Sequence, residues 1–117
     1  MPIETLTLPA DPAAALETLR AASHRLPVLL FKKSPRCPIS FAAEAEWREL
    51  LAAGDGFAAA EIDVVHERPL ARGVTELLGI RHESPQALLF RAGSVVWHES
   101  HERLTRPTFE GVLARRA

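Results

Sequence analysis

VLLFKKSPRCPIS, residues 28–40, joins an apolar run to a basic segment and to a cysteine followed by proline. The apolar residues 28–31 predict a buried strand, and Pro38 with the apolar positions after it predicts a helix. Cys37 therefore falls where a strand passes into the first turn of a helix. Backbone N–H groups converge at a helix start and the helix dipole favours an anion, so this position favours a thiolate.

The residues around Cys37 indicate how a thiolate would be stabilised. Cys37 is the only cysteine in the sequence, so its chemistry must proceed through mixed disulfides with another molecule. Arg36 and the lysines at 32–33 add positive charge, and the N–H groups of Ile39 and Ser40 would face the sulfur. The Ser40 hydroxyl either points at the sulfur or satisfies the backbone of the first turn. Arg36 is either solvated or steers an anionic adduct.

Length, composition and charge limit the classes to which the protein can belong. The 117 residues predict one domain, residues 1–117, and 47% of them are hydrophobic and 25% charged, as in ordinary globular proteins. The formal net charge of -1 argues against binding to nucleic acid or a membrane surface. The sequence has neither an apolar run near the roughly 20 residues of a membrane span nor a signal-peptide pattern. A lone cysteine cannot form an internal disulfide, so we expect a cytoplasmic protein.

Strands and helices are predicted to alternate along the chain. Helices are expected to begin at Asp11, Pro38, Pro69 and Thr105. Strands are expected at residues 27–31, 57–64, 86–91 and 94–98. The last two would form an antiparallel hairpin, and a weak alternation at residues 3–8 would add an edge strand. The order α-β-α-β-α-β-β-α predicts an α/β fold, with a mixed central sheet and helices on both faces.

Three segments at these spacings resemble the monothiol bacilliredoxin family of the bacillithiol system. They are FKKSPRCPIS at residues 31–40, GIRHESPQ at 79–86 and WHESH at 97–101. The C-P-I-S box gains specificity from its combination with H-x-S-P-Q and W-x-x-S-H. The resemblance extends over most of the chain and implies a thioredoxin-like fold. Family members usually have a small polar residue in place of Pro35, and this departure stiffens the loop before Arg36.

The resemblance implies thiol–disulfide exchange on proteins that carry a bacillithiol adduct. Cys37 matches the family's redox cysteine, and Ser40 stands where a dithiol relative has its resolving cysteine. Pro85 matches the cis-proline of the thioredoxin fold, and the Ser84 backbone before it would pair with an extended partner. His82 belongs to the same substrate-binding segment, either as a proton donor or as a brace for the loop. Bacillithiol would be a co-substrate, with no cofactor bound.

Three functions from different classes fit these residues. The first is an exchanger whose partners are bacillithiolated proteins and a low-molecular-weight thiol. The second is a thioredoxin-like binding or redox-sensing module whose cysteine is a regulatory adduct site. The third, delivery of a cluster or metal, ranks last because Pro38 and Ile39 replace the Gly-Phe of the C-G-F-S box. The histidines match no zinc-site spacing, so no metal site is predicted.

Overall fold

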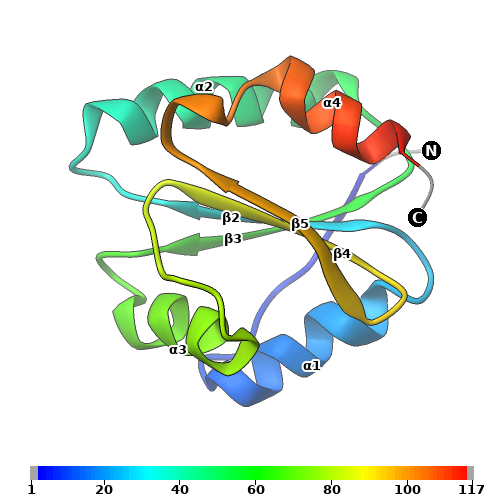
Figure 1. The fold of residues 1–117 in the computed structure, drawn as a ribbon, viewed down its shortest axis with the longest axis vertical. Coiled ribbons are helices and arrows are strands. Elements are labelled where there is room, and N and C mark those ends of the chain that lie inside the picture. The colour runs from blue at the N-terminus through cyan, green and yellow to red at the C-terminus, as the bar shows by residue number, and fades with distance from the viewer. Residues whose placement is uncertain (1–2, 116–117) are drawn as a thin grey trace.

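A five-stranded sheet lies between two layers of helices in the computed structural model, which describes residues 3–115 (Figure 1). In chain order the elements are β1 (Glu4–Thr5), α1 (Pro12–Ala22), β2 (Val28–Lys33), α2 (Pro38–Ala53), β3 (Ala58–Asp63), α3 (Arg68–Leu78), β4 (Gln86–Arg91), β5 (Ser94–Ser100), the 3₁₀ helix η1 (His101–Arg103) and α4 (Arg106–Ala114). Helices α2 and α4 cover one face of the sheet, and α1 and α3 cover the other (Figure 1). The expected α/β fold, with helices on both faces of a mixed sheet, is confirmed.

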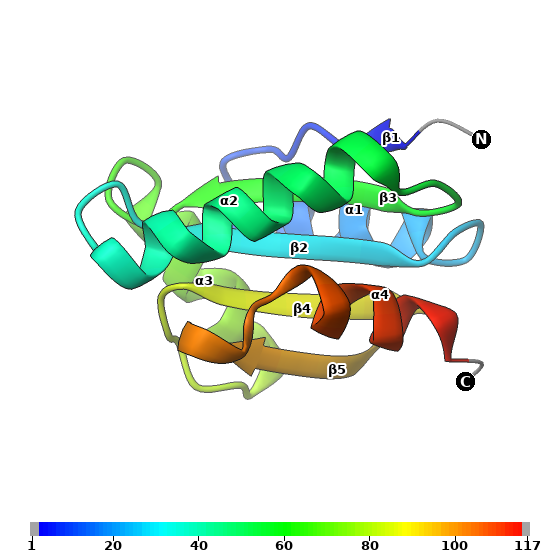
Figure 2. The same cartoon turned by 90° about the horizontal axis from the view of Figure 1, so that it is seen from above.

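The order of the strands brings the segments around Cys37 and Pro85 to the same end of the sheet. The order is β1-β3-β2-β4-β5, in which β2 runs parallel to β3 and antiparallel to β4. Near the end of β2, Lys32 pairs with Gln86, the first residue of β4. The segment that leaves β2 and the segment that enters β4 therefore lie at one end of the sheet (Figure 2).

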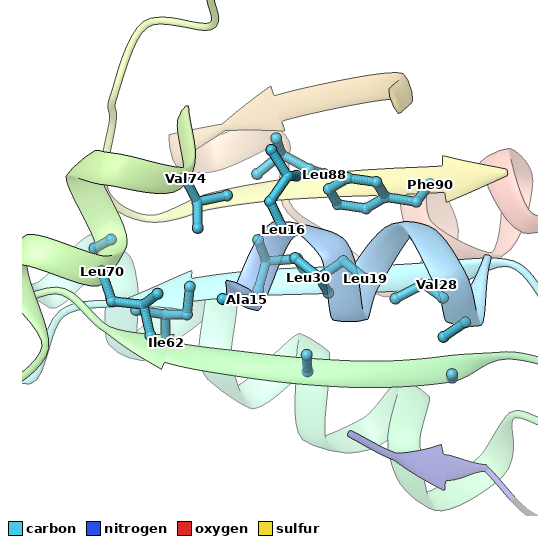
Figure 3. Packing of buried hydrophobic residues seen from close by; sticks show 14 residues of the cluster. Ala15, Leu16, Leu19, Val28, Leu30, Ile62, Leu70, Val74, Leu88 and Phe90 are labelled. Atoms are coloured by element: carbon cyan, nitrogen blue, oxygen red, sulfur yellow. The ribbon is translucent and has the colours of Figure 1, made fainter. Parts of the chain in front are cut away.

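Side chains of β2 point alternately to opposite faces of the sheet and join two hydrophobic clusters. Val28 and Leu30 pack against α1 and α3 (Figure 3). Leu29 and Phe31 belong to the cluster under α2 and α4, where the Phe31 ring stacks on Trp47 with ring centroids 5.1 Å apart. All of these side chains are buried, which explains why β2 reads as a continuous apolar run.

Some element boundaries differ from those that the sequence predicts. The weak alternation at residues 3–8 gives only a short strand, Glu4–Thr5, which pairs with β3 at the sheet edge. β5 continues to Ser100, and the positive φ of His101, 62°, then ends the strand and begins η1. β2 does not end with its apolar run but includes the two lysines that follow it. The first of these lysines stays in the strand because it finds polar partners inside the protein.

Lys32 is this charged residue in the interior. Its side chain is fully buried and lies on the same side of β2 as Leu30. The ammonium group is 2.7 Å from Nδ1 of His82 and 2.8 Å from Oε1 of Gln86. It also lies 3.5 Å from Oγ1 of Thr75. An ammonium group has three donors and no acceptor, so it donates to all three atoms.

Burial and neighbouring charges change the protonation of this cluster. Burial lowers the pKa of Lys32 to about 7, with the positive charge of Arg72 acting in the same direction and Glu83 opposing it. Burial also lowers the pKa of His82 to about 4, and the positive charges of Lys32 and Arg72 contribute. The His82 ring is therefore neutral near pH 7, and its Nδ1 can accept the hydrogen bond from the ammonium group.

Lys32 should make the stability of the protein rise with pH. An unfolded lysine keeps its proton up to a pKa near 10.5, whereas the folded protein releases it near 7. Below the lower value both states carry the proton, and the full cost of burying the charge is present. Between the two values the folded state binds fewer protons than the unfolded state, so the free energy of unfolding increases with pH.

The measurement is urea unfolding of the wild type and of Lys32→Met at several pH values. The wild-type free energy of unfolding, minus that of the variant, should increase by up to about 1.4 kcal/mol per pH unit between about pH 7 and pH 10. The subtraction removes the contributions of all other titrating groups that the two proteins share. A difference that is constant or that falls with pH would contradict the lowered pKa of Lys32.

Candidate functional site

Cys37 lies at the start of α2 and is partly exposed to solvent. It is the N-cap residue, with extended backbone angles of φ -114° and ψ 123°, and its side chain makes no capping hydrogen bond. The first N–H groups of a helix have no partner within the helix, and Pro38 has no N–H at all. The structure gives no hydrogen bond from the N–H groups of Ile39 and Ser40 to the Cys37 side chain, so their role in stabilising a thiolate stays a prediction.

Two serines hold the thiol loop, residues 34–37. The Ser34 N–H donates to Oγ of Ser40 at 2.7 Å, and the Arg36 N–H donates to Oγ of Ser34 at 3.3 Å. Ser40 is fully buried, whereas Pro35 and Arg36 are exposed. Of the two roles considered for the Ser40 hydroxyl, these bonds support the one in which it satisfies the backbone. The hydroxyl fixes the shape of the loop that carries the thiol.

The three basic residues near the thiol differ in what their charges contact. Lys33 lies 3.5 Å from Glu44 and 3.4 Å from Glu61, so carboxylates of α2 and β3 offset its charge. Lys32 carries its charge into the interior. The expectation that both lysines add charge around the thiol is thus corrected, because both have partners elsewhere. Arg36 is exposed on the thiol loop and is the basic residue of the three best placed to meet an anion from solvent.

The proline loop, residues 79–85, lies at the same end of the sheet as the thiol loop. The Ser84–Pro85 peptide bond is cis, the configuration that the family resemblance implies, and Pro85 is buried. The Pro85 carbonyl accepts a hydrogen bond from the His101 N–H at 3.1 Å. The Glu83 carboxylate lies 3.4 Å from Nδ1 of His101. The end of β5 and the start of η1 therefore brace the proline loop.

Ser84 carries a buried hydroxyl for which residues 3–115 provide no hydrogen-bond partner. Nearly all buried polar groups in native proteins are paired, so an unpaired one needs an explanation. Ser84 directly precedes the cis-proline, at the end of the sheet where the thiol lies. The oxygen is closed off from solvent, so Ser84 would meet a docked partner through its backbone.

His82 and Gln86 shape the proline loop from inside. Nε2 of Gln86 donates to the Arg81 carbonyl at 2.9 Å, and its Oε1 accepts from the Glu83 N–H at 3.3 Å. His82 is held by the ammonium group of Lys32. Of the two roles considered for His82, these contacts support the brace. The structure does not test its assignment to substrate binding.

Sequence reasoning missed Lys32 and Gln86 as parts of the site. A signal for the lysine was present, because alternation along a strand places Lys32 on the same face as Val28 and Leu30. Because Lys32 is charged, it was interpreted as the beginning of a loop. Gln86 directly follows Pro85, but its partners become apparent only when β2 and β4 are paired.

Apolar side chains are exposed beside Cys37, along the first turn of α2. Ile39 is 37% exposed and Phe41 is 55% exposed. A pocket of about 310 Å³ opens between α2 and η1, and its lining residues are Ile39, Ala42, Ala43, Glu46, His101, Glu102, Leu104 and Thr105. This pocket and the two exposed side chains place apolar surface next to the thiol.

His66 and His98 lie apart on the protein surface. His66 lies 3.0 Å from Asp63, and His98 is exposed on β5. Within residues 3–115, no group of three or more His, Cys, Asp or Glu residues is arranged to hold a metal ion. In the same part of the chain, no helix combines the length and the apolar composition that crossing a membrane requires.

Solved structures with the same fold include thioredoxins. A protein described as having a thioredoxin fold is 24% identical, with a TM-score of 0.74 over 93% of this chain and 91% of that chain. Fasciola hepatica thioredoxin is 14% identical, with a TM-score of 0.71 over 97% and 98% of the two chains. Thioredoxin f from spinach chloroplast, in its short form, is 16% identical, with a TM-score of 0.68 over 96% and 90%. These likenesses confirm the thioredoxin-like fold.

A family model described as monothiol bacilliredoxin BrxC matches residues 10–108. The match includes the thiol loop, the proline loop and all of β2 to β5. It confirms the resemblance seen in the C-P-I-S, H-x-S-P-Q and W-x-x-S-H segments, and it supports a function in thiol redox chemistry. With its lone cysteine at a helix start and a cis-proline at the same end of a thioredoxin-like sheet, the chain belongs to the monothiol bacilliredoxin BrxC family.

Proposed function

We propose that the protein removes bacillithiol from protein mixed disulfides by thiol–disulfide exchange at Cys37. The observation that carries the proposal is the position of the chain's only cysteine, partly exposed at the N-cap of α2. Membership of the monothiol bacilliredoxin family supports bacillithiol as the adduct. A single thiol cannot close an internal disulfide, so the adduct must move onto Cys37 itself.

The proposed step moves a disulfide from the target protein to Cys37. The Cys37 thiolate attacks the bacillithiol sulfur of the mixed disulfide, and a new S–S bond forms between these two atoms. The bond between that sulfur and the target cysteine breaks, and the target leaves as a thiolate that takes a proton from water. A free bacillithiol thiolate then attacks the adduct sulfur on Cys37. This second step releases bacillithiol disulfide and restores the Cys37 thiolate.

Different residues around the thiol would bind the adduct and the target protein. Arg36 would attract the carboxylates of the malate-bearing adduct, for which a guanidinium group is well suited. Ser84 would pair with an extended segment of the target through its backbone. The exposed Ile39 and Phe41 would contact apolar surface of the target.

The direct test is the transfer of a bacillithiol adduct between two proteins. A reporter protein with one bacillithiol mixed disulfide is mixed with an equal amount of this protein, and both are followed by intact mass. The adduct mass should leave the reporter, appear on the wild type and disappear again when free bacillithiol is added. Cys37→Ser should not accept the adduct. Ser40→Ala should only slow the transfer, because it loosens the thiol loop and leaves the thiol in place.

Two other outcomes of this experiment have definite meanings. If Cys37 accepts the adduct but free bacillithiol does not release it, the second step is wrong, and either a reductase regenerates the thiol or the cysteine is a regulatory adduct site. If the reporter loses its adduct at the wild-type rate in the presence of Cys37→Ser, the proposed mechanism is wrong.

Arg36 should discriminate between adducts by their charge. Arg36→Ala should slow the transfer of the anionic bacillithiol adduct by up to about tenfold, the effect of losing one charge-assisted hydrogen bond. Transfer of a neutral 2-mercaptoethanol adduct from the same reporter should be unchanged. Arg36→Lys should recover part of the loss because it keeps the charge but not the planar fork. High salt screens the charge of Arg36, so the transfer rates of the wild type and Arg36→Ala should be closer together at high salt than at low salt. Equal slowing of both adducts in Arg36→Ala would contradict this role.

A further inference from the structure

The proposed chemistry does not use the lysine buried in β2. Lys32 is fully buried beside Leu30, in a position that an apolar side chain of similar length could fill. Taking a charge out of water is costly, and apolar replacements of buried charges are often neutral or stabilising. Stability alone therefore does not explain a lysine here. Its hydrogen-bond partners indicate another role.

Lys32 determines which way the Gln86 amide faces. While Lys32 carries its proton, its ammonium group can only donate, so it must meet the amide oxygen, which lies 2.8 Å away. The amide nitrogen then points at the proline loop and donates to the Arg81 carbonyl. The amide oxygen also accepts from the Glu83 N–H. One oriented side chain thus ties the backbone of the loop on both sides of His82.

Lys32 also holds the His82 ring. Nδ1 of this ring accepts from the ammonium group at 2.7 Å. The ring therefore connects the proline loop to β2, whose Lys32 also reaches Thr75 of α3. His82 and Gln86 both accept hydrogen bonds from Nζ of Lys32. The loop that leads to Pro85 therefore depends on this one nitrogen atom.

We propose that Lys32 is a positioning residue, whose buried ammonium group holds the proline loop in the shape that receives a target protein. The inference rests on the proposed function in that it takes this loop as the docking element. The thiol loop is held separately, by the bonds among Ser34, Arg36 and Ser40. Removing Lys32 should therefore weaken docking and leave the reactivity of the thiol nearly unchanged.

The first test compares Lys32→Met with the wild type in turnover of the bacillithiolated reporter, with free bacillithiol in excess. KM for the reporter should rise about tenfold, as expected for losing hydrogen bonds to a charged group, while kcat changes by less than about twofold. The rate at which iodoacetamide alkylates Cys37 should likewise stay within about twofold, since the loss of loop hydrogen bonds does not reach the thiol. Val74→Ala is the control, because it removes packing from α3 one residue before Thr75 without removing a member of the cluster.

A second pair of variants keeps the test valid if Lys32→Met does not fold. His82→Gln keeps a hydrogen-bond acceptor for the ammonium group, whereas His82→Leu removes it. We expect KM to remain near the wild-type value in His82→Gln and to rise in His82→Leu. A proton-donating role for His82 would instead lower kcat in both variants and would overturn the positioning role.

Hydrogen exchange of the backbone amides of residues 81–84 tests the inference without any substrate, since Pro85 has no N–H and those of Gly79 and Ile80 bond to α3. Exchange should be faster in Lys32→Met and His82→Leu than in the wild type, and unchanged in Val74→Ala. If the wild type transfers no bacillithiol, the proposed function fails while this measurement still reports on the loop. Any one of three results for Lys32→Met would overturn the inference. Its loop amides could exchange at the wild-type rate, or its KM could rise no more than that of Val74→Ala. The third result is an alkylation rate of Cys37 that falls by the same factor as kcat/KM for the reporter.

Discussion

The antiparallel pairing of β2 with β4 is the constraint on which the rest of the structure depends. The register places Lys32 opposite Gln86, so the loop that carries the thiol leaves the sheet where the proline loop enters it. A slip of one residue would turn every side chain of β2 to the other face. Leu30 and Phe31 would then exchange hydrophobic clusters, and the ammonium group would point away from His82. Fold and site are therefore specified by the same register.

The two halves of the site are held by different sets of hydrogen bonds. The thiol loop is closed locally, by the Ser40 hydroxyl on the Ser34 N–H. The proline loop is held from the interior by the partners of Lys32 and from the sheet edge by the His101 N–H on Pro85. This separation lets the chemistry of the sulfur and the recognition of a partner vary independently.

The protein departs from the simplest rules of stability in the part of the molecule where it is expected to act. A charge is buried at Lys32, and at Ser84 a hydroxyl is buried for which the described part of the chain, residues 3–115, provides no partner. Each departure has a cost in free energy, and both lie at the end of the sheet that carries Cys37. Other parts of the chain show ordinary features, with α1 and α4 capped by Asp11 and Thr105 and apolar side chains on both faces of β2. Such a concentration of departures is typical of a functional site.

The sequence by itself determined the alternation of strands and helices, the helix start at Cys37 and the family, because caps, periodicity and short motifs are local signals. It did not determine that Lys32 is buried, since its partners His82 and Gln86 lie 50 and 54 residues further along the chain. A charged residue at the end of an apolar run resembles the start of a loop until its distant acceptors are known. Only the tertiary structure decided this, because the pairing of strands brings those acceptors within reach of one nitrogen atom.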